Sequence, residues 1–204
     1  MPLSQVKEKE MSDSTKNVLI VGVGGQGVIL ASNALSEVAM ARGFDVKKNE
    51  AHGQSQRGGT VPSHIRYGAK VYSSIITRGE AHIVLAFEEL EGLRFAHFLK
   101  SDGILILNRQ RIYPPRVSSG LDLYPEDIPR LLRENGVDTI EVDALGIARE
   151  LGNPVVVSTV LLGVLSRYLE FSGREWTETI GRLAPEEHRD LNLRAFEAGR
   201  TLDH

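Results

Sequence analysis

The sequence feature that most constrains the fold is a glycine-rich turn between an apolar run and a helical segment. Asn17 to Val21 is rich in leucine and β-branched residues, Gly22-Val23-Gly24-Gly25-Gln26-Gly27 follows, and apolar residues then recur at helical spacing from Val28 to Met40. Gly43 ends this helix, and Phe44 to Asn49 can form a second strand. This order predicts a βαβ unit with a right-handed crossover and therefore a parallel sheet.

Beyond residue 50 the pattern leaves the strand–helix alternation and then returns to it. Two alternating runs, Thr60 to Arg66 and Lys70 to Ile76, are joined by Tyr67-Gly68-Ala69 and favour an inserted β-hairpin. Runs typical of strands buried on both faces follow at 81–87 and 103–107, with an amphipathic helix at 89–99, a helix at 127–134 and a strand at 139–142. We expect a Rossmann-like three-layer α/β/α fold, with a mostly parallel sheet and the inserted β-hairpin.

The C-terminal region is predicted to be helical, with the core sheet ending before it. Val155 to Leu169 stays apolar for longer than a usual strand, and Pro154 is favourable in the first turn of a helix. We therefore expect a buried helix here. Arg174 to Arg200 has the pattern of two amphipathic helices interrupted at Pro185.

Length and composition bound the class of protein. The 204 residues suit a single domain, which we place at 16–204 after a polar leader at 1–15 that we expect to be disordered. A net charge of -3 gives no field that attracts nucleic acid or a membrane surface, and the N-terminus has no apolar signal or anchor. Cysteine is absent, so the chain has no thiolate for an iron–sulfur cluster, a zinc site or a nucleophile. We expect a cytoplasmic protein.

The glycine turn fits the G-x-G-x-x-G pattern of dinucleotide-binding proteins. Glycines in this context let the backbone approach a diphosphate at the positive N-terminus of a helix. A nicotinamide enzyme also needs an acid at the end of the second strand to hold the ribose, and Glu50 has that place, although Lys47 and Lys48 crowd the strand. The alternatives are a structural turn or another phosphate ligand. Gly24 and Gly27 are expected to need a positive φ or close helix–strand packing.

A second candidate site lies in the loop from Ala51 to Thr60, where Arg57 stands beside Gly58 and Gly59. A guanidinium fork next to exposed backbone N–H groups can clamp a phosphate or a carboxylate. Alternatively, Arg57 fixes the loop to a carboxylate of this chain or of a partner.

The other polar residues form no recognisable catalytic set. The histidines at 52, 64 and 82 lack the spacing of metal ligands, and we interpret His64 as a hydrogen-bonded strand residue rather than a base. Ser158 lacks the glycines of a nucleophile elbow, and Ser101-Asp102-Gly103 is interpreted as a turn. We assign no catalytic and no metal-binding residue.

Three motifs, in this order, resemble the gamma domain of pyruvate and 2-oxoacid:ferredoxin oxidoreductases. They are Gly-Gly-Gln-Gly at 24–27, Gln-Arg-Gly-Gly at 56–59 and Ser-His-Ile-Arg at 63–66. Further similar stretches lie at 71–73, 80–82, 87–91, 152–154, 160–163 and 191–197. The resemblance thus spans nearly the whole chain after the leader, and the Arg-Gly-Gly context favours the indolepyruvate, or aryl-pyruvate, branch.

The resemblance implies a small subunit that holds no cofactor alone and docks beside a large alpha subunit carrying thiamine diphosphate, magnesium and [4Fe-4S] clusters. In such complexes a 2-oxoacid is decarboxylated, electrons pass to ferredoxin, and coenzyme A takes the acyl group. We predict that the glycine turn and the Arg57 loop lie at the subunit interface and contact coenzyme A phosphates. The predicted binding residues are Gly22, Gly24, Gly25, Gln26, Gly27, Arg57, Gly58 and Gly59.

Two other functions fit some of the same residues. A stand-alone NAD(P)-binding dehydrogenase rests on the glycine turn and Glu50, and a non-catalytic nucleotide-binding module rests on the turn alone. A chain that normally docks is also expected to expose an apolar patch and to form a homodimer when isolated. The residues do not identify which 2-oxoacid is used.

Overall fold

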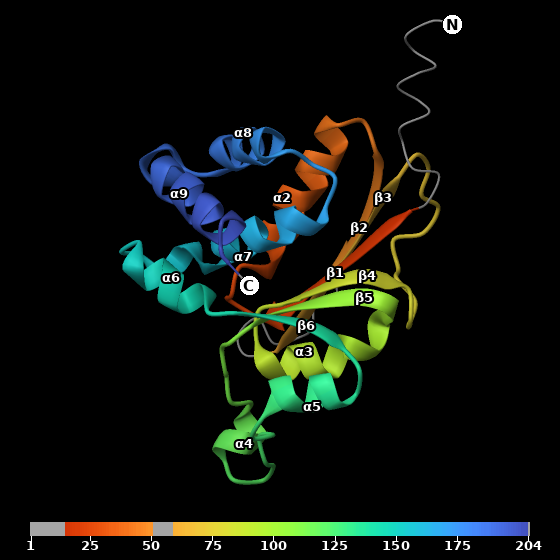
Figure 1. The fold of residues 1–204 in the computed structure, drawn as a ribbon, viewed down its shortest axis with the longest axis vertical. Coiled ribbons are helices and arrows are strands. Elements are labelled where there is room, and N and C mark those ends of the chain that lie inside the picture. The colour runs from red at the N-terminus through yellow and green to blue at the C-terminus, as the bar shows by residue number, and fades with distance from the viewer. Residues whose placement is uncertain (1–14, 51–58, 204) are drawn as a thin grey trace, which may run out of the picture.

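The computed structural model describes residues 15–50 and 59–203. Within these ranges it contains a six-stranded sheet in the order β2-β3-β1-β4-β5-β6, with helices on both faces (Figure 1). The strands are β1 (Lys16–Val23), β2 (Asp45–Glu50), β3 (Thr60–Gly68), β4 (Ala81–Ala86), β5 (Leu99–Asn108) and β6 (Asp138–Val142). The predicted α/β class with a mostly parallel sheet is confirmed.

The helices divide between the two faces of the sheet. One face is covered by α2 (Val28–Ala41), α6 (Ala144–Glu150), α7 (Val157–Leu165), α8 (Gly173–Leu183) and α9 (Arg189–Arg200) (Figure 1). The other face is covered by α3 (Glu89–Phe95) and α5 (Ile128–Glu134), while the short α4 (Pro115–Ser118) projects from the end of β5 (Figure 1). None of the helices in the described ranges is long and apolar enough to cross a membrane.

Strand β1 lies at the centre of the fold because both of its faces are apolar. Val18 and Ile20 pack on the α2 side, while Leu19 and Val21 pack on the α3 side. β1 runs parallel to β4, β4 to β5, and β5 to β6. The carboxyl ends of these strands therefore meet at one edge of the sheet, where the glycine turn also lies.

The predicted hairpin between Thr60 to Arg66 and Lys70 to Ile76 is wrong in its pairing. β3 pairs antiparallel with β1 on one side and with β2 on the other, so neither of its edges is left for a third strand. The segment after β3 is irregular and is held by side chains: His64 Nδ1 accepts a hydrogen bond from the Ile76 N–H at 3.2 Å, and Arg66 donates to the carbonyls of Ser73 and Ile75. The inserted antiparallel strand is thus β3, between the two strands of the predicted βαβ unit.

The helical predictions agree with the structure except in detail. The helix expected at 89–99 ends at Phe95 and continues as the 3-10 helix η1 (Ala96–Phe98). The buried helix begins at Pro154 as η2 (Pro154–Val156) before α7, and it ends in η3 (Ser166–Tyr168). Pro185 separates α8 from η4 (Glu186–His188) and α9. Helix α6 was not predicted, and the leader at 1–14 lies outside the described residues.

Candidate functional site

The glycine turn is shaped by two left-handed backbone positions. Gly25 has a φ of 97° and Gly27 a φ of 89°, values that side-chain-bearing residues rarely adopt. Gly27 is the N-cap of α2, and its carbonyl accepts the first hydrogen bond of the helix from Ala31 at 3.0 Å. The positive φ expected at Gly27 is therefore present, whereas the second such position in the turn is Gly25 and not Gly24.

The first glycine of the turn is required by packing. A Cβ on Gly22 would lie 2.8 Å from Val28 Cγ2, 2.9 Å from Gln26 Oε1 and 2.9 Å from Phe87 Cβ. This closeness lets β1 and α2 approach each other, which is one of the roles of glycine in such turns.

An amide network fills the inside of the turn. Gln26 Oε1 accepts a hydrogen bond from the Val23 N–H at 2.7 Å, and Gln26 Nε2 donates to Phe87 O at 3.1 Å and to Gln110 Oε1 at 3.2 Å. Asn108 Nδ2 donates to the same two acceptors, and Asn108 Oδ1 accepts from the Ala144 N–H. The turn is thereby tied to the ends of β4, β5 and β6, and Gln26 acts inside the protein.

The structure brings most of the predicted binding residues together. The Gly24 N–H donates to Gly59 O at 3.0 Å, which places the end of the second candidate loop beside the glycine turn. Arg57 and Gly58 lie outside the described residues. The glycine turn and Gly59, at the end of the second loop, therefore meet at the carboxyl edge of the sheet, where ligands of α/β proteins commonly bind.

Glu50 does not occupy the place that a ribose-binding acid needs. β3 lies between β1 and β2, so Glu50 stands two strands from the glycine turn, a displacement of about 10 Å at the usual strand spacing. Its carboxylate accepts from Ser32 Oγ at 3.0 Å and pairs with Lys48 at 2.8 Å. This geometry disfavours the dehydrogenase interpretation.

Three buried acids at the start of α3 were not predicted as a group. Glu88, Glu89 and Glu91 are at most 5% exposed. Glu88 caps α3 by accepting from the Glu91 N–H at 2.9 Å, and its other oxygen accepts from Tyr124 Oη at 2.6 Å and from the Ile112 N–H at 3.1 Å. The sequence signal was three acids within one helical turn directly after a buried strand, a pattern more often seen on exposed helix starts.

The partners of Glu88 and Glu89 come from residues 109–127, the segment that carries α4, whereas Glu91 pairs with Arg94 of α3 itself at 2.7 Å. Arg111 Nε donates to Glu89 at 2.8 Å, and this hydrogen bond raises the pKa of the guanidinium. Burial, reinforced by the neighbouring Glu88, raises the pKa of Tyr124 well above its usual range. Burial also raises the pKa of Glu91, whose Oε2 has no hydrogen-bond partner among the described residues. Glu88 and Glu89 fix this segment against α3 and serve the fold.

His64 and His82 have structural partners, as His64 was predicted to have. His64 Nδ1 accepts from the Ile76 N–H, and His82 Nδ1 accepts from the Asn17 N–H at 3.0 Å. Burial lowers the pKa of both rings. No group of three potential metal ligands gathers among residues 15–50 and 59–203, and His52 lies outside them.

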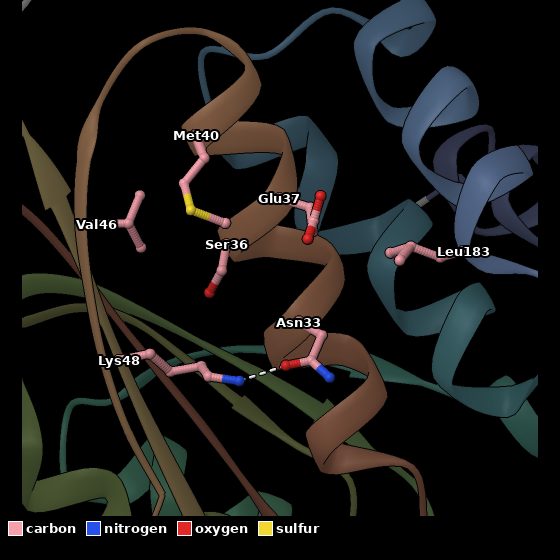
Figure 2. Close-up of a pocket in the computed structure, with 7 residues that line it drawn as sticks. All are labelled: Asn33, Ser36, Glu37, Met40, Val46, Lys48 and Leu183. Atoms are coloured by element: carbon pink, nitrogen blue, oxygen red, sulfur yellow. Dashed lines mark hydrogen bonds between the residues drawn. The ribbon is translucent and has the colours of Figure 1, made fainter.

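A pocket of about 370 Å³ lies along α2, away from the glycine turn (Figure 2). It is lined by Asn33, Ser36, Glu37, Met40, Val46, Lys48 and Leu183. Lys48 donates to Asn33 Oδ1 (Figure 2) and also pairs with Glu50 at 2.8 Å, while Glu37 pairs with Arg182 at 2.9 Å. Since its two charged groups already have partners, the pocket offers no unpaired charge for a ligand.

Comparison with known proteins gives one consistent result. The family model described as pyruvate ferredoxin/flavodoxin oxidoreductase matches residues 17–202. The indolepyruvate oxidoreductase subunit IorB of Thermococcus kodakarensis is 38% identical over 188 residues, which are 90% of this chain and 93% of the relative.

Solved structures share the fold at lower identity. The pyruvate oxidoreductase subunit PORC of Thermotoga maritima superposes with a TM-score of 0.69 at 23% identity, over 92% of this chain and 96% of that chain. The 2-oxoglutarate:ferredoxin oxidoreductase of Magnetococcus marinus, with 2-oxoglutarate, coenzyme A and succinyl-CoA bound, gives a TM-score of 0.71 at 21% identity, over 93% of this chain and 31% of that chain. The same fold therefore occurs both as a separate small chain and within a longer one.

Proposed function

The chain belongs to the pyruvate ferredoxin/flavodoxin oxidoreductase family, as a small subunit of a 2-oxoacid:ferredoxin oxidoreductase, and we propose that its complete enzyme is of the indolepyruvate type. The observation that carries this proposal is the match, over nine-tenths of both chains, to a relative that is itself named a subunit of an indolepyruvate oxidoreductase. Both the glycine turn and the C-terminal helices fall within the family match.

The large partner subunit is proposed to hold the thiamine diphosphate, the magnesium ion and the [4Fe-4S] clusters. The absence of cysteine from this chain supports this division, because such clusters are held by cysteine thiolates. Thiamine diphosphate would supply the carbanion chemistry that decarboxylates an aryl 2-oxoacid, and electrons would pass through the clusters to ferredoxin. The assembled enzyme is proposed to be cytoplasmic.

We propose that this chain contributes to the complete enzyme at the carboxyl edge of the sheet, where the glycine turn meets the end of the Arg57 loop. The hydrogen bond from Gly24 to Gly59 supports a common surface, and the N-terminus of α2 is favourable for an anion. Gly24, Gly25 and Gly27, with Arg57, Gly58 and Gly59, are proposed to face the partner and the phosphates of coenzyme A, while Gly22 is proposed to set the shape of the turn from its packed position. Gln26 would contribute by holding the turn, since its amide is bonded inside the protein.

A test of this surface is the Arg57→Ala variant, assayed in the reconstituted enzyme. Loss of a guanidinium that binds phosphate is expected to raise the KM for coenzyme A about tenfold and to leave the KM for the 2-oxoacid unchanged. Arg174→Ala is the matched control, because Arg174 is 86% exposed on α8 and pairs there with Glu178. Equal KM values for coenzyme A in the wild-type and Arg57→Ala enzymes would contradict the proposed contact.

The enzyme assignment is tested by using this chain as bait in native cell extract. The eluate is assayed for coenzyme A-dependent reduction of a viologen dye with indolepyruvate, pyruvate and 2-oxoglutarate. Recovery of a large iron–sulfur subunit with preference for indolepyruvate is the expected result, and preference for another 2-oxoacid would overturn the substrate class. Recovery of the chain alone, with tight binding of NADH or another nucleotide, would favour the dehydrogenase or the nucleotide-binding module.

A further inference from the structure

The backbone fixes the orientation of one side-chain amide at the carboxyl edge of the sheet. Gln26 Oε1 accepts from the Val23 N–H at 2.7 Å, so the other end of this amide, Nε2, is a donor. Asn108 Oδ1 accepts from the Ala144 N–H at 3.2 Å, so Asn108 Nδ2 is likewise a donor. Both nitrogens donate to the side chain of Gln110, at 3.2 Å each. The oxygen of Gln110 is therefore the atom that faces them, and its Nε2 is turned away from the network.

The backbone of Gln110 is also held in place. Its carbonyl accepts from the Glu89 N–H at 2.9 Å, and its N–H donates to Asn108 O at 2.7 Å. The side chain is partly exposed, and Nε2 reaches solvent and donates to no group within 15–50 or 59–203. The N–H donors of Nε2 are thus presented in a fixed direction, an arrangement typical of binding sites because little freedom is lost when a ligand binds.

The network lies where the connections between strands change sides. β1 and β4 are parallel neighbours, but β1 leads into α2 on one face of the sheet and β4 leads toward α3 on the other (Figure 1). Gln26 follows β1, and Phe87 follows β4 and accepts at its carbonyl from both Gln26 and Asn108. Ligands of open α/β sheets commonly bind at such a switch point. Gln110 therefore stands where a ligand is expected.

The charges around Gln110 disfavour an anion as its partner. Glu89, whose N–H binds Gln110 O, and the preceding Glu88 are buried carboxylates. Arg111 pairs with Glu89 at 2.8 Å, and Arg109 pairs with an acid of β6 at 3.9 Å. The described donors to Glu88 are a tyrosine hydroxyl and backbone N–H groups, none of them charged. An uncharged carbonyl oxygen avoids repulsion by Glu88 and suits the neutral N–H donors of Gln110.

We propose that Gln110 Nε2 donates a hydrogen bond to an amide carbonyl in the pantetheine arm of coenzyme A. This arm contains the only uncharged carbonyl groups of coenzyme A, between the phosphates and the thiol. The glycine turn and the Arg57 loop keep the phosphates, so contacts at both places orient the arm along the carboxyl edge of the sheet. Gln26 and Asn108 are positioning residues, because they act through Gln110. This inference rests on the proposed function, since it takes coenzyme A as the ligand.

Two substitutions of Gln110 separate its donor from its acceptor. Gln110→Glu keeps an oxygen for Gln26 and Asn108 but removes the N–H donors, whereas Gln110→Met, of similar length and uncharged, removes donor and acceptor together. In the reconstituted enzyme each variant is expected to raise the KM for coenzyme A about fivefold and to leave the KM for the 2-oxoacid unchanged. The thermal midpoint of the purified chain should fall further in Gln110→Met, because only this variant leaves the inner donors without an acceptor.

The pattern across the two variants decides the role of Gln110. A higher KM for coenzyme A in Gln110→Met alone would mean that the residue only closes the inner network. A higher KM in Gln110→Glu alone would be an effect of the added charge. Either result, or a wild-type KM in both variants, would overturn the contact.

A truncated substrate identifies the part of coenzyme A that Gln110 binds. Phosphopantetheine keeps the pantetheine arm and lacks the adenosine part, so its KM, or its inhibition constant against coenzyme A, should rise by the same factor in both variants. A rise confined to coenzyme A would place Gln110 beside the diphosphate or the adenosine and overturn the carbonyl as its partner.

The Arg57→Ala variant separates this inference from the proposed function. A higher KM for coenzyme A in Arg57→Ala, with wild-type values in both Gln110 variants, would overturn only the contact at Gln110. A wild-type enzyme that does not use coenzyme A would overturn both.

Discussion

The two faces of the sheet are stabilised by different means. On the α2 side, side chains from β1, β3, β4 and β5 pack against α2, α7, α8 and α9 in a single apolar cluster that includes Trp176 and Phe196. On the α3 side the apolar cluster is smaller, and buried Glu88 and Glu89 hold the segment at 109–127 to α3. The first face depends on close packing and the second on polar groups whose partners must all be present.

Close packing on the α2 side is tightest where α7 crosses α9. A Cβ on Gly199 would fall within the van der Waals radius of Val160 O, and one on Gly163 would fall within that of Phe196 O. Because the neighbouring atoms belong to helix backbones, they cannot move aside as a flexible side chain can. Small residues at this crossing therefore determine how near the last helix lies to the core.

The largest effect is predicted for Gly199→Val. The added side chain should force α9 away from α7 and lower the free energy of unfolding by about 4 kcal/mol or more, measured by urea denaturation. Gly181→Ala is the control, because a Cβ there has no atom nearer than 3.9 Å and should raise stability by about 0.5–1 kcal/mol through helix propensity. Equal stability of the Gly199→Val and wild-type chains would show that the helix crossing is looser than described.

A smaller effect is predicted for Glu88→Ala on the α3 side. The substitution leaves Tyr124 Oη, the Ile112 N–H and the Glu91 N–H without their acceptor, and a loss of about 3 kcal/mol is expected in the same assay. Glu178→Ala, which removes a 62% exposed carboxylate on α8, should cost about 0.5 kcal/mol. A loss below 1 kcal/mol for Glu88→Ala would mean that the buried acids contribute little and that the two faces resemble each other.

The smallest effect is predicted for the pH dependence of the free energy of unfolding. It also distinguishes the two faces of the sheet, because His64 and His82 both lie on the α3 side. Burial lowers the pKa of each ring in the folded chain, so the unfolded chain takes up protons first as the pH falls. The stability they contribute is complete above about pH 6.5 and is lost as the pH falls through the lower folded values. Unfolding free energies measured from pH 7.5 to pH 5 should therefore decrease.

His64→Asn should reduce this decrease, because an amide oxygen can accept from the Ile76 N–H without titrating. His188→Asn, on the surface in η4, should leave the slope unchanged. A slope that His64→Asn does not alter would place the pH dependence elsewhere in the molecule.

Much of the fold follows from the order of residues in the chain. The glycine turn after β1, the strands with two apolar faces and the helix that begins at Pro154 were predicted, because local conformational preference and burial both leave a pattern in the sequence. The absence of cysteine, which limits the redox chemistry of this chain, is likewise a property of the sequence alone.

The tertiary structure decided which segments are neighbours. Alternation of apolar and polar residues along Lys70 to Ile76 is typical of a strand, but β3 already has a partner strand on each edge. The backbone of this segment is hydrogen-bonded to the side chains of His64 and Arg66 instead. The same insertion of β3 moved Glu50 away from the glycine turn. The acids of α3 and the inward amide of Gln26 also depend on partners far along the chain. A single sequence does not specify such pairs, because it encodes the face of each side chain but not what packs against it.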